Sequence, residues 1–387
     1  MDFAFTEEQL AIRDAVARIC EGFPADYWLK LDREGGFPHD FHAALAAGGW
    51  LGIAMPEAHG GAGRGITEAA LIMQTVSQSG AGFSGASAVH MNIFGLHPVV
   101  MFGTEEQKAR WLPPLIRGEH KSCFAVTEPT TGLNTLKLKT QAKRVGDKYV
   151  VNGQKVWIST AQVAHKVLLL ARTAPAETSK SGEGLTLFYT DLDRSKVSVR
   201  EIEKLGRKAV DSNELFIDGL EVPLEDRIGE EGQGFRYILH GMNPERILIA
   251  AEAVGLGRAA LARAAHYAGE RVVFDRPIGQ NQGVAHPLAK NWIELEAAEL
   301  LVYKAAWKYD MGQPCGAEAN AAKYFAGEAG YRACETAVLT HGGMGYAKEY
   351  HVERYLRESM LPRIAPVSMQ MVFNFIAEKV LGLPKSY

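Results

Sequence analysis

The sequence predicts an α+β protein in which an N-terminal helical domain, a middle β domain and a C-terminal helical bundle follow one another. Apolar residues change from helical to strand spacing near residue 121 and return to helical spacing near residue 229. Turn dipeptides recur in the middle segment at intervals typical of an antiparallel β-barrel or sandwich. We therefore expect domains at 1–120, 121–228 and 229–387, an order unlike the alternating strands and helices of a doubly wound fold.

Helix-start signals support the first domain. Thr6-Glu7-Glu8-Gln9 and Thr104-Glu105-Glu106-Gln107 both read as capping boxes, in which the hydroxyl and the amide satisfy free backbone N–H groups. Pro38 suits the first turn of a further helix, where its missing N–H costs little. The glycine run at 60–63 follows no clear strand and does not have the dinucleotide-binding pattern.

Short strands are expected in the middle domain. The predicted strands are 149–151, 167–171, 185–190, 197–202 and 214–217, and the polar segment 173–183 is expected to be a loop. Helices are expected again at about 247–271, 317–340 and 367–382. A further long helix carries one apolar stripe, interrupted by Glu299, that consists of Leu288, Trp292, Leu295, Val302, Ala306 and Tyr309.

Composition narrows the class of protein. Of the 387 residues, 47% are hydrophobic and 22% are charged, as in soluble globular enzymes, and the net charge of −3 gives no reason to expect nucleic acid or an anionic membrane as partner. The first residues show no leader pattern, and no apolar run approaches a membrane span. The four cysteines are far apart and show no zinc spacing. We expect a cytoplasmic protein with reduced thiols and no metal.

Residues 124–159 are the candidate functional stretch. Apolar residues, turns and hydroxyl side chains alternate in this stretch. This mixture suits a β wall that presents amides and hydroxyls to a flat ring with polar edges. Two strands of an ordinary sheet explain the same composition, so the stretch alone leaves both interpretations open.

Four motifs in a fixed order connect this stretch to a known family. They are Thr127-Glu128-Pro129, Trp157-Ile158-Ser159, Arg271-x-x-Phe274 with Gln282, and His341-Gly342-Gly343-Met344-Gly345-Tyr346. Together with the helix–sheet–helix order, they resemble the acyl-CoA dehydrogenases over essentially the whole chain. The resemblance implies bound FAD, an acyl-CoA substrate, an electron-transferring flavoprotein as partner and a homotetramer.

The resemblance also assigns cofactor contacts. The flavin-side residues that it implies are Phe124, Val126, Thr127, Gly132, Leu133, Trp157, Ile158 and Ser159. The other implied FAD contacts are Arg271, Phe274, Gln282, Leu339, Gly342, Gly343 and Ser368. In the family, the pyrophosphate and adenosine contacts come from a neighbouring subunit. Arg suits phosphate because its guanidinium is planar and always charged, and paired glycines let backbone approach a ligand closely.

The catalytic base is the next inference from the resemblance. One branch of the family carries it in a Glu-Gly-Thr segment near the C-terminus, but Pro366 occupies that position here. The branch resembling isovaleryl-CoA and long-chain dehydrogenases has Glu before Arg at the start of a helix, which Glu245 matches. A structural alternative is that Asn243 caps this helix and Glu245 complements its dipole. Glu349 and Glu358 are the fallback bases.

The sequence prediction also names substrate contacts and the positions at which this chain departs from the family pattern. Leu133, Asn243 and Arg246 are the expected substrate-binding residues. Leu133 and Leu339 stand where many relatives carry Ser and Gln, and Asp275 stands where Gly is common. Three functions remain open: an acyl-CoA dehydrogenase, a flavin oxidase of the same fold, and a catalytically silent CoA-binding or scaffold protein.

Overall fold

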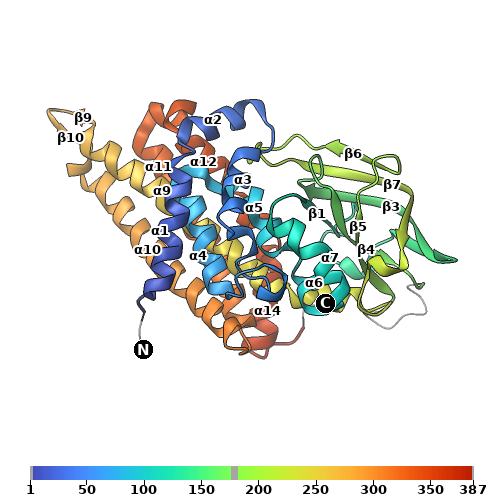
Figure 1. Cartoon of the computed structure of the whole chain (residues 1–387). Coiled ribbons are helices and arrows are strands. Elements are labelled where there is room, and N and C mark those ends of the chain that lie inside the picture. The colour runs from blue at the N-terminus through green and yellow to red at the C-terminus, as the bar shows by residue number, and fades with distance from the viewer. Residues whose placement is uncertain (1–2, 176–181, 386–387) are drawn as a thin grey trace.

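The computed structural model describes residues 3–175 and 182–385, in which a large helical part lies beside a β-sheet (Figure 1). The N-terminal helices are α1 (Glu7–Glu21), α2 (Ala25–Glu34), α3 (His39–Ala47), α4 (Ile66–Val76), α5 (Gly82–His90), α6 (His97–Phe102) and α7 (Glu105–Ile116). The expected succession of helical, β and helical regions is confirmed. No helix in the described ranges has the length and apolarity needed to cross a bilayer.

Both predicted capping boxes start helices. In α1, the Gln9 N–H donates to Thr6 Oγ1 over 3.2 Å and the Thr6 N–H donates to Gln9 Oε1 over 3.0 Å. The same pair of bonds joins Thr104 and Gln107 at α7. Pro38 precedes α3 as its N-cap residue, one position before the helical turn expected for it.

The middle region is one mixed sheet. Its strands are β1 (Ser122–Ala125), β2 (Gln141–Val145), β3 (Lys148–Ser159), β4 (Lys166–Arg172), β5 (Leu185–Asp191), β6 (Val197–Glu201), β7 (Ser212–Pro223) and β8 (Arg227–Ile228). The strand order is β6-β7-β3-β2-β4-β5-β8, mostly antiparallel, while β1 pairs with β4 in parallel. Four of the five predicted strands lie within these elements, and the strand predicted at 197–202 extends one residue beyond β6. Residues 176–181 of the expected loop lie outside the described residues.

The C-terminal helices surround one central helix. They are α8 (Gly234–His240), α9 (Met242–Glu270), α10 (Gln282–Asp310), α11 (Gly316–His341), α12 (Val352–Glu358), α13 (Leu361–Ile364) and α14 (Met369–Phe375). A hairpin of β9 (Val272–Val273) and β10 (Arg276–Pro277) follows α9. One hydrophobic core joins α9, α10 and α11 to the N-terminal helices, so both helical regions of the chain share it.

The apolar stripe predicted on α10 is only partly buried. Leu295, Val302 and Ala306 are fully buried, but Trp292 is 53% exposed, so this part of the stripe faces away from the core of the chain. Glu299, which interrupts the stripe, pairs with Arg258 of α9. The helix therefore buries a narrower face than its apolar spacing predicts.

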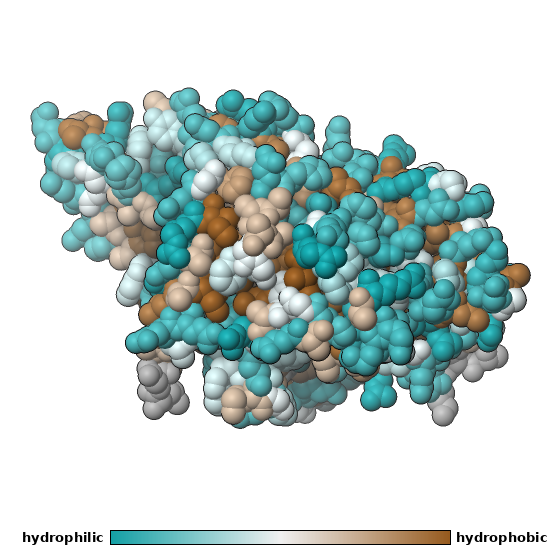
Figure 2. All heavy atoms as spheres, viewed as in Figure 1, coloured by the Kyte–Doolittle hydropathy of each residue, from teal (hydrophilic) through white to brown (hydrophobic). Residues whose placement is uncertain are grey.

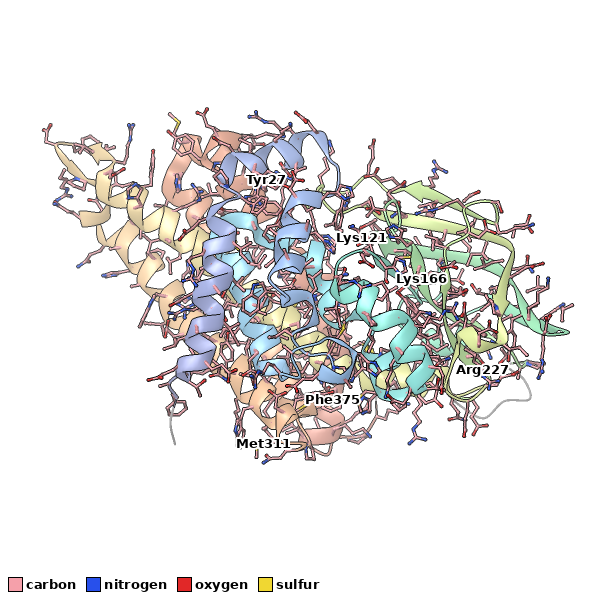
Figure 3. The ribbon with its side chains drawn as sticks, in the orientation of Figure 1. Tyr27, Lys121, Lys166, Arg227, Met311 and Phe375 are labelled. Atoms are coloured by element: carbon pink, nitrogen blue, oxygen red, sulfur yellow. The ribbon has the colours of Figure 1, made fainter. Side chains whose placement is uncertain are left out.

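The sheet is attached to the helices by specific contacts. Figure 3 shows Lys121 at the boundary between the N-terminal helices and the sheet, and its Nζ lies 5.6 Å from the centroid of the Phe37 ring. On α7, Gln107 Nε2 donates to the carbonyl oxygens of Glu225 and Arg227 over 2.8 and 2.7 Å. These contacts attach the sheet to the N-terminal helical region.

Candidate active site

The two predicted flavin-side segments lie next to each other. The Val156 N–H donates to the Thr127 carbonyl oxygen over 2.9 Å, which joins the segment after β1 to β3. The pairing of β3 with β7 shifts register between Lys155 and Ile158. Trp157 adopts a φ of 63° there, and its side chain is 58% exposed. The bulge therefore presents a flat aromatic side chain outside the regular ladder.

The two segments together form a wall, and a buried ion pair supports it from inside the sheet domain. Lys155 Nζ donates to Glu128 Oε1 and the Val126 carbonyl oxygen, both over 3.0 Å, and to the Leu170 carbonyl oxygen over 2.8 Å. Burial lowers the pKa of Lys155 to about 8. Sequence reasoning missed this lysine, although a charged side chain at an inward-facing strand position signals a buried partner.

Glu245 lies in the first turn of α9 and contacts a buried histidine. Glu245 Oε2 is 2.7 Å from His90 Nε2, and the Glu245 side chain is 27% exposed. On the other side of the ring, His90 Nδ1 is 2.7 Å from Glu252 Oε1, and the Glu252 side chain is completely buried. Sequence reasoning missed His90 and Glu252, although Glu252 interrupts an apolar run of α9 two turns after Glu245.

His90, Glu245 and Glu252 form a trio whose charges affect one another. Burial acts to lower the pKa of His90, but the adjacent carboxylates of Glu245 and Glu252 raise it well above its ordinary value. Burial raises the pKa of Glu252, an effect that His90 opposes. An imidazolium between two carboxylates is therefore the favoured charge arrangement.

Arg207 connects α5, the helix that carries His90, to the wall. Its guanidinium donates to Ser87 Oγ of α5 and to Ser159 Oγ of β3, each over 3.0 Å, and to Ser212 Oγ over 3.2 Å. Ser87 lies one helical turn before His90, so the two residues share a face of α5. A guanidinium only donates, so each serine oxygen accepts here and the Ser159 hydroxyl hydrogen stays free to donate to a ligand.

Two of the three predicted substrate-binding residues, Asn243 and Arg246, flank Glu245 at the start of α9, whereas Leu133 lies in the segment after β1. Gly241 is the N-cap of α9, so the alternative in which Asn243 caps the helix is wrong. Asn243 instead lies inside the first turn, where its Oδ1 accepts from Arg246 Nη1 over 3.2 Å. Arg246 Nε is buried and has no hydrogen-bond partner within the described residues, and burial lowers the pKa of the guanidinium.

The fallback carboxylates have other environments. Glu358 is buried and accepts hydrogen bonds from the Ser84 hydroxyl over 2.6 Å and the Ser84 N–H over 3.2 Å, and it pairs with Arg354. Glu349 is exposed on a short turn after α11. Ser368 caps α14 and accepts from the Met371 N–H over 3.4 Å.

The remaining predicted cofactor residues lie at the other end of the molecule. Arg271 follows α9, about 39 Å along the helix axis from Glu245 at 1.5 Å per residue, and Figure 1 shows the β9–β10 hairpin projecting away from the sheet. Phe274 at its tip is 94% exposed, and Figure 2 shows hydrophobic atoms at that tip. Stacking of Tyr267 on His341 places the Gly342-Gly343 turn beside the same end of α9. A single chain therefore does not bring Arg271, Phe274, Gln282, Leu339, Gly342 and Gly343 to the wall.

Turn geometry explains why Asp275 can stand in this hairpin where Gly is common. Phe274 and Asp275 both have positive φ, 51° and 62°, as a tight two-residue hairpin turn requires. Asp tolerates this conformation better than most side chains. Asp275 therefore maintains the turn where glycine would be the usual choice.

The wall fits an isoalloxazine ring. The hydroxyls of Thr131 and Thr160 flank the two wall segments, are buried and have no partner in residues 3–175 and 182–385. Leu133 is 62% exposed beside them, and a Cβ on Gly132 would meet nothing within 4 Å. Unpartnered hydroxyls, the Ser159 hydroxyl and an exposed indole match the polar edge and apolar face of a flavin.

Comparison with known proteins agrees with this geometry. The sequence matches the acyl-CoA dehydrogenase N-terminal domain over residues 6–119, the middle domain over 123–220 and the C-terminal domain over 232–381. It is 39% identical to acyl-CoA dehydrogenase FadE12 of Mycobacterium tuberculosis (strain ATCC 25618 / H37Rv), covering 100% of this chain and 99% of that protein. It is 33% identical to the caffeyl-CoA reductase-Etf complex subunit CarC of Acetobacterium woodii, covering 92% and 93%.

A solved structure shows the same fold. Butyryl-CoA dehydrogenase from Megasphaera elsdenii superposes with a TM-score of 0.93 and 29% identity, covering 98% of this chain and 100% of that one. The chain therefore belongs to the acyl-CoA dehydrogenase family of oxidoreductases, which confirms the resemblance inferred from the motifs. The members of this family are FAD-dependent flavoproteins, and FAD is the cofactor of this chain.

Proposed function

We propose that this enzyme oxidises an acyl-CoA thioester to the trans-2-enoyl-CoA, with Glu245 as the base that removes the α-proton. The observation that carries the proposal is the hydrogen-bonded connection from the wall to the base. Ser159 on the wall and Ser87 on α5 share Arg207, and His90, one turn further on α5, contacts Glu245. This connection supports the proposal because it brings Glu245 and Ser159 into one region of the molecule.

The chain's own residues would act on the proton and on substrate position. Glu245 takes the α-proton on the carboxylate oxygen that does not contact His90, and the electron pair of the broken C–H bond stays with the substrate. Proton removal by a positioned carboxylate contributes roughly 10²- to 10⁴-fold in rate. FAD, when bound, supplies the acceptor for the β-hydrogen. Asn243 and Arg246 flank the CoA arm, and the unpartnered Arg246 Nε is a free donor for it.

The FAD site is proposed to need a second copy of the chain. Phe124, Val126, Thr127, Gly132, Leu133, Trp157, Ile158 and Ser159 would hold the flavin side, with Ser368 as a further hydroxyl contact. Arg271, Phe274, Gln282, Leu339, Gly342 and Gly343 would bind the pyrophosphate and adenosine side of a neighbouring chain's FAD. Their separation from the wall within one chain supports this division, and a homotetramer is the proposed assembly.

We also propose a division into domains at 1–120, 121–228 and 229–387, with the base in the third and the wall in the second. An electron-transferring flavoprotein is the proposed electron acceptor, because the similar protein from Acetobacterium woodii is named as part of a reductase-Etf complex. The proposed location is the cytoplasm.

Anaerobic titration of the holoenzyme with a panel of acyl-CoA esters tests this function. We expect at least one ester to bleach the flavin absorbance, which then persists on admission of air and recovers when an electron-transferring flavoprotein is added. Bleaching that air reverses rapidly would identify an oxidase. A flavin that no ester bleaches would contradict catalysis and favour a silent CoA-binding protein.

A further inference from the structure

A buried imidazole between two carboxylates is the least expected arrangement of charge near the site. His90 lies at the end of α5, and both of its ring nitrogens contact carboxylate oxygens of α9 at 2.7 Å. Glu252 is completely buried, and its second oxygen, Oε2, has no partner in the described part of the chain. Apolar side chains of similar volume would satisfy packing without the desolvation cost of these ionisable groups.

We propose that His90, anchored by Glu252, is a positioning residue for the base: it fixes the Glu245 carboxylate and keeps a positive charge beside it until the α-proton arrives. This inference rests on the proposed function, because it assigns a task to the neighbours of Glu245. Neither His90 nor Glu252 touches the substrate in this scheme. Both act through Glu245.

Hydrogen-bond counting supports the charge assignment. Carboxylate oxygens and bare ring nitrogens only accept, so each 2.7 Å contact must contain a hydrogen. Both hydrogens are placed on His90 because the two adjacent carboxylates raise its pKa well above the ordinary value. Distances near 2.7 Å are typical of the charge-assisted bonds that an imidazolium donates to carboxylates. The trio then carries a single net negative charge, which is placed on the two glutamates.

Glu252 gives the trio a second stable state. When Glu245 takes the α-proton, a substrate C–H bond breaks and a Glu245 O–H bond forms. The Nδ1 hydrogen of His90 can then pass to Glu252 Oε1, which breaks an N–H bond, forms an O–H bond and leaves the imidazole neutral. Burial raises the pKa of Glu252, which favours this acceptance. The trio is uncharged after the step, and no buried cation is left without its counterion.

Other charged groups around α5 do not replace Glu245 and Glu252 as the partners of His90. Arg207 faces the helix from the segment before β7, and Glu358 and Arg354 face it from α12. From α3, His42 Nε2 donates to Asn92 Oδ1 over 3.2 Å. Glu68, the charged residue of α4, is bonded to Gly65 and Gln9 at the start of that helix, and the segments 77–81 and 91–95 carry no titratable side chain.

The pH profile of flavin reduction tests the inference. The rate of anaerobic flavin reduction by an acyl-CoA that bleaches the wild type is measured from about pH 5 to about pH 9. In His90→Gln, the amide still donates to Glu245 but carries no charge, so the attraction between the imidazolium and the Glu245 carboxylate is lost. We expect the acidic limb to move up by about 1 to 3 pH units, with a rate loss of about ten-fold per unit on its acidic side. Glu252→Gln shifts the limb in the same direction by less, because the imidazole remains.

Two further variants distinguish the expected charge effect from a loss of folding. His90→Gln combined with Glu252→Gln removes the unpaired buried charge and should show the same shift as His90→Gln alone. His42→Gln is the matched control, since it replaces another buried histidine that contacts neither glutamate, and its profile should coincide with that of the wild type. FAD content and circular dichroism verify that each variant is folded.

Nitrogen-15 NMR of histidine-labelled holoenzyme gives a readout that does not depend on activity. The His90 signals, identified by their loss in His90→Gln, should show both ring nitrogens protonated at neutral pH in the resting enzyme. A neutral ring, or a profile whose acidic limb stays in place in His90→Gln and in the double variant, would overturn the inference. If instead Glu245→Gln is reduced at the wild-type rate, the proposed function itself fails, so the two failures are distinguishable.

Discussion

Individual residues show what a single sequence can and cannot assign. Glu245 could be predicted because one family position was occupied by Pro366 and another offered a carboxylate before an arginine. His90 and Glu252 could not, because a lone histidine or glutamate in an apolar helical run has no partner until the helices are packed together. The contact between His90 and Glu245 joins residues 155 positions apart in the sequence.

The buried Lys155 makes a prediction at the residue scale. Lys155→Met leaves Glu128 buried without its counterion, so the free energy of unfolding should fall by about 3–5 kcal/mol. Lys148→Met is the matched control on the same strand, because Lys148 pairs with Glu221 at the surface, where such pairs contribute about 0–1 kcal/mol. Urea denaturation of the holoenzyme measures both. Equal small losses would show that Lys155 does not support the wall.

Elements were more predictable than residues, because local signals determine where helices and strands begin. Both capping boxes were found from such signals, as were five of the eight strands of the described sheet, β3 to β7. The parallel pairing of β1 with β4 was not, since pairing partners far apart in sequence leave no local pattern. The exposure of Trp292 was also missed, because apolar spacing identifies a face without saying whether this chain or another covers it.

The close approach of α9 and α4 gives a prediction at the element scale. A Cβ on Gly255 would lie 2.4 Å from the Gln74 carbonyl oxygen, a backbone atom that cannot move aside cheaply. Gly255→Ala should therefore lower the free energy of unfolding by about 1–3 kcal/mol or more.

Gly269→Ala is the control on the same helix. Nothing lies within 4 Å of a Cβ there, so the substitution should be neutral or stabilise by about 0.4–1 kcal/mol. Thermal denaturation of the two variants separates close packing from helix propensity. A Gly255→Ala protein as stable as the Gly269→Ala protein would contradict the tight helix contact.

At the scale of the whole molecule, the predicted FAD residues fall into two distant groups. The sequence could name both groups from their motifs, but only the fold shows that the long α9 separates them (Figure 1). On α10, Ile293, Leu300 and Trp307 recur every seven residues and are 61%, 57% and 54% exposed. Such an exposed apolar row on one helix face is typical of an interface between subunits.

Disrupting the exposed apolar row of α10 should lower both the molecular mass of the assembly and the FAD content of the protein. Ile293→Glu combined with Leu300→Glu places two charges on the exposed face of α10, so the assembly should dissociate and FAD should be retained poorly. Light scattering after size-exclusion chromatography and the ratio of flavin to protein absorbance measure these effects. Val145→Glu with Phe216→Glu, at exposed positions of the sheet, should change neither. A smaller species with full FAD content would contradict a site shared between chains.

Flavin reduction in Glu245→Gln is the most direct test of the proposed chemistry. Under anaerobic stopped-flow conditions, with an acyl-CoA that bleaches the wild type, the variant should retain FAD and bind the ester yet reduce the flavin roughly 10²- to 10⁴-fold more slowly. Glu349→Gln, at an exposed carboxylate outside the trio, should match the wild type. Near-normal reduction in Glu245→Gln would contradict the assignment of Glu245 as the base.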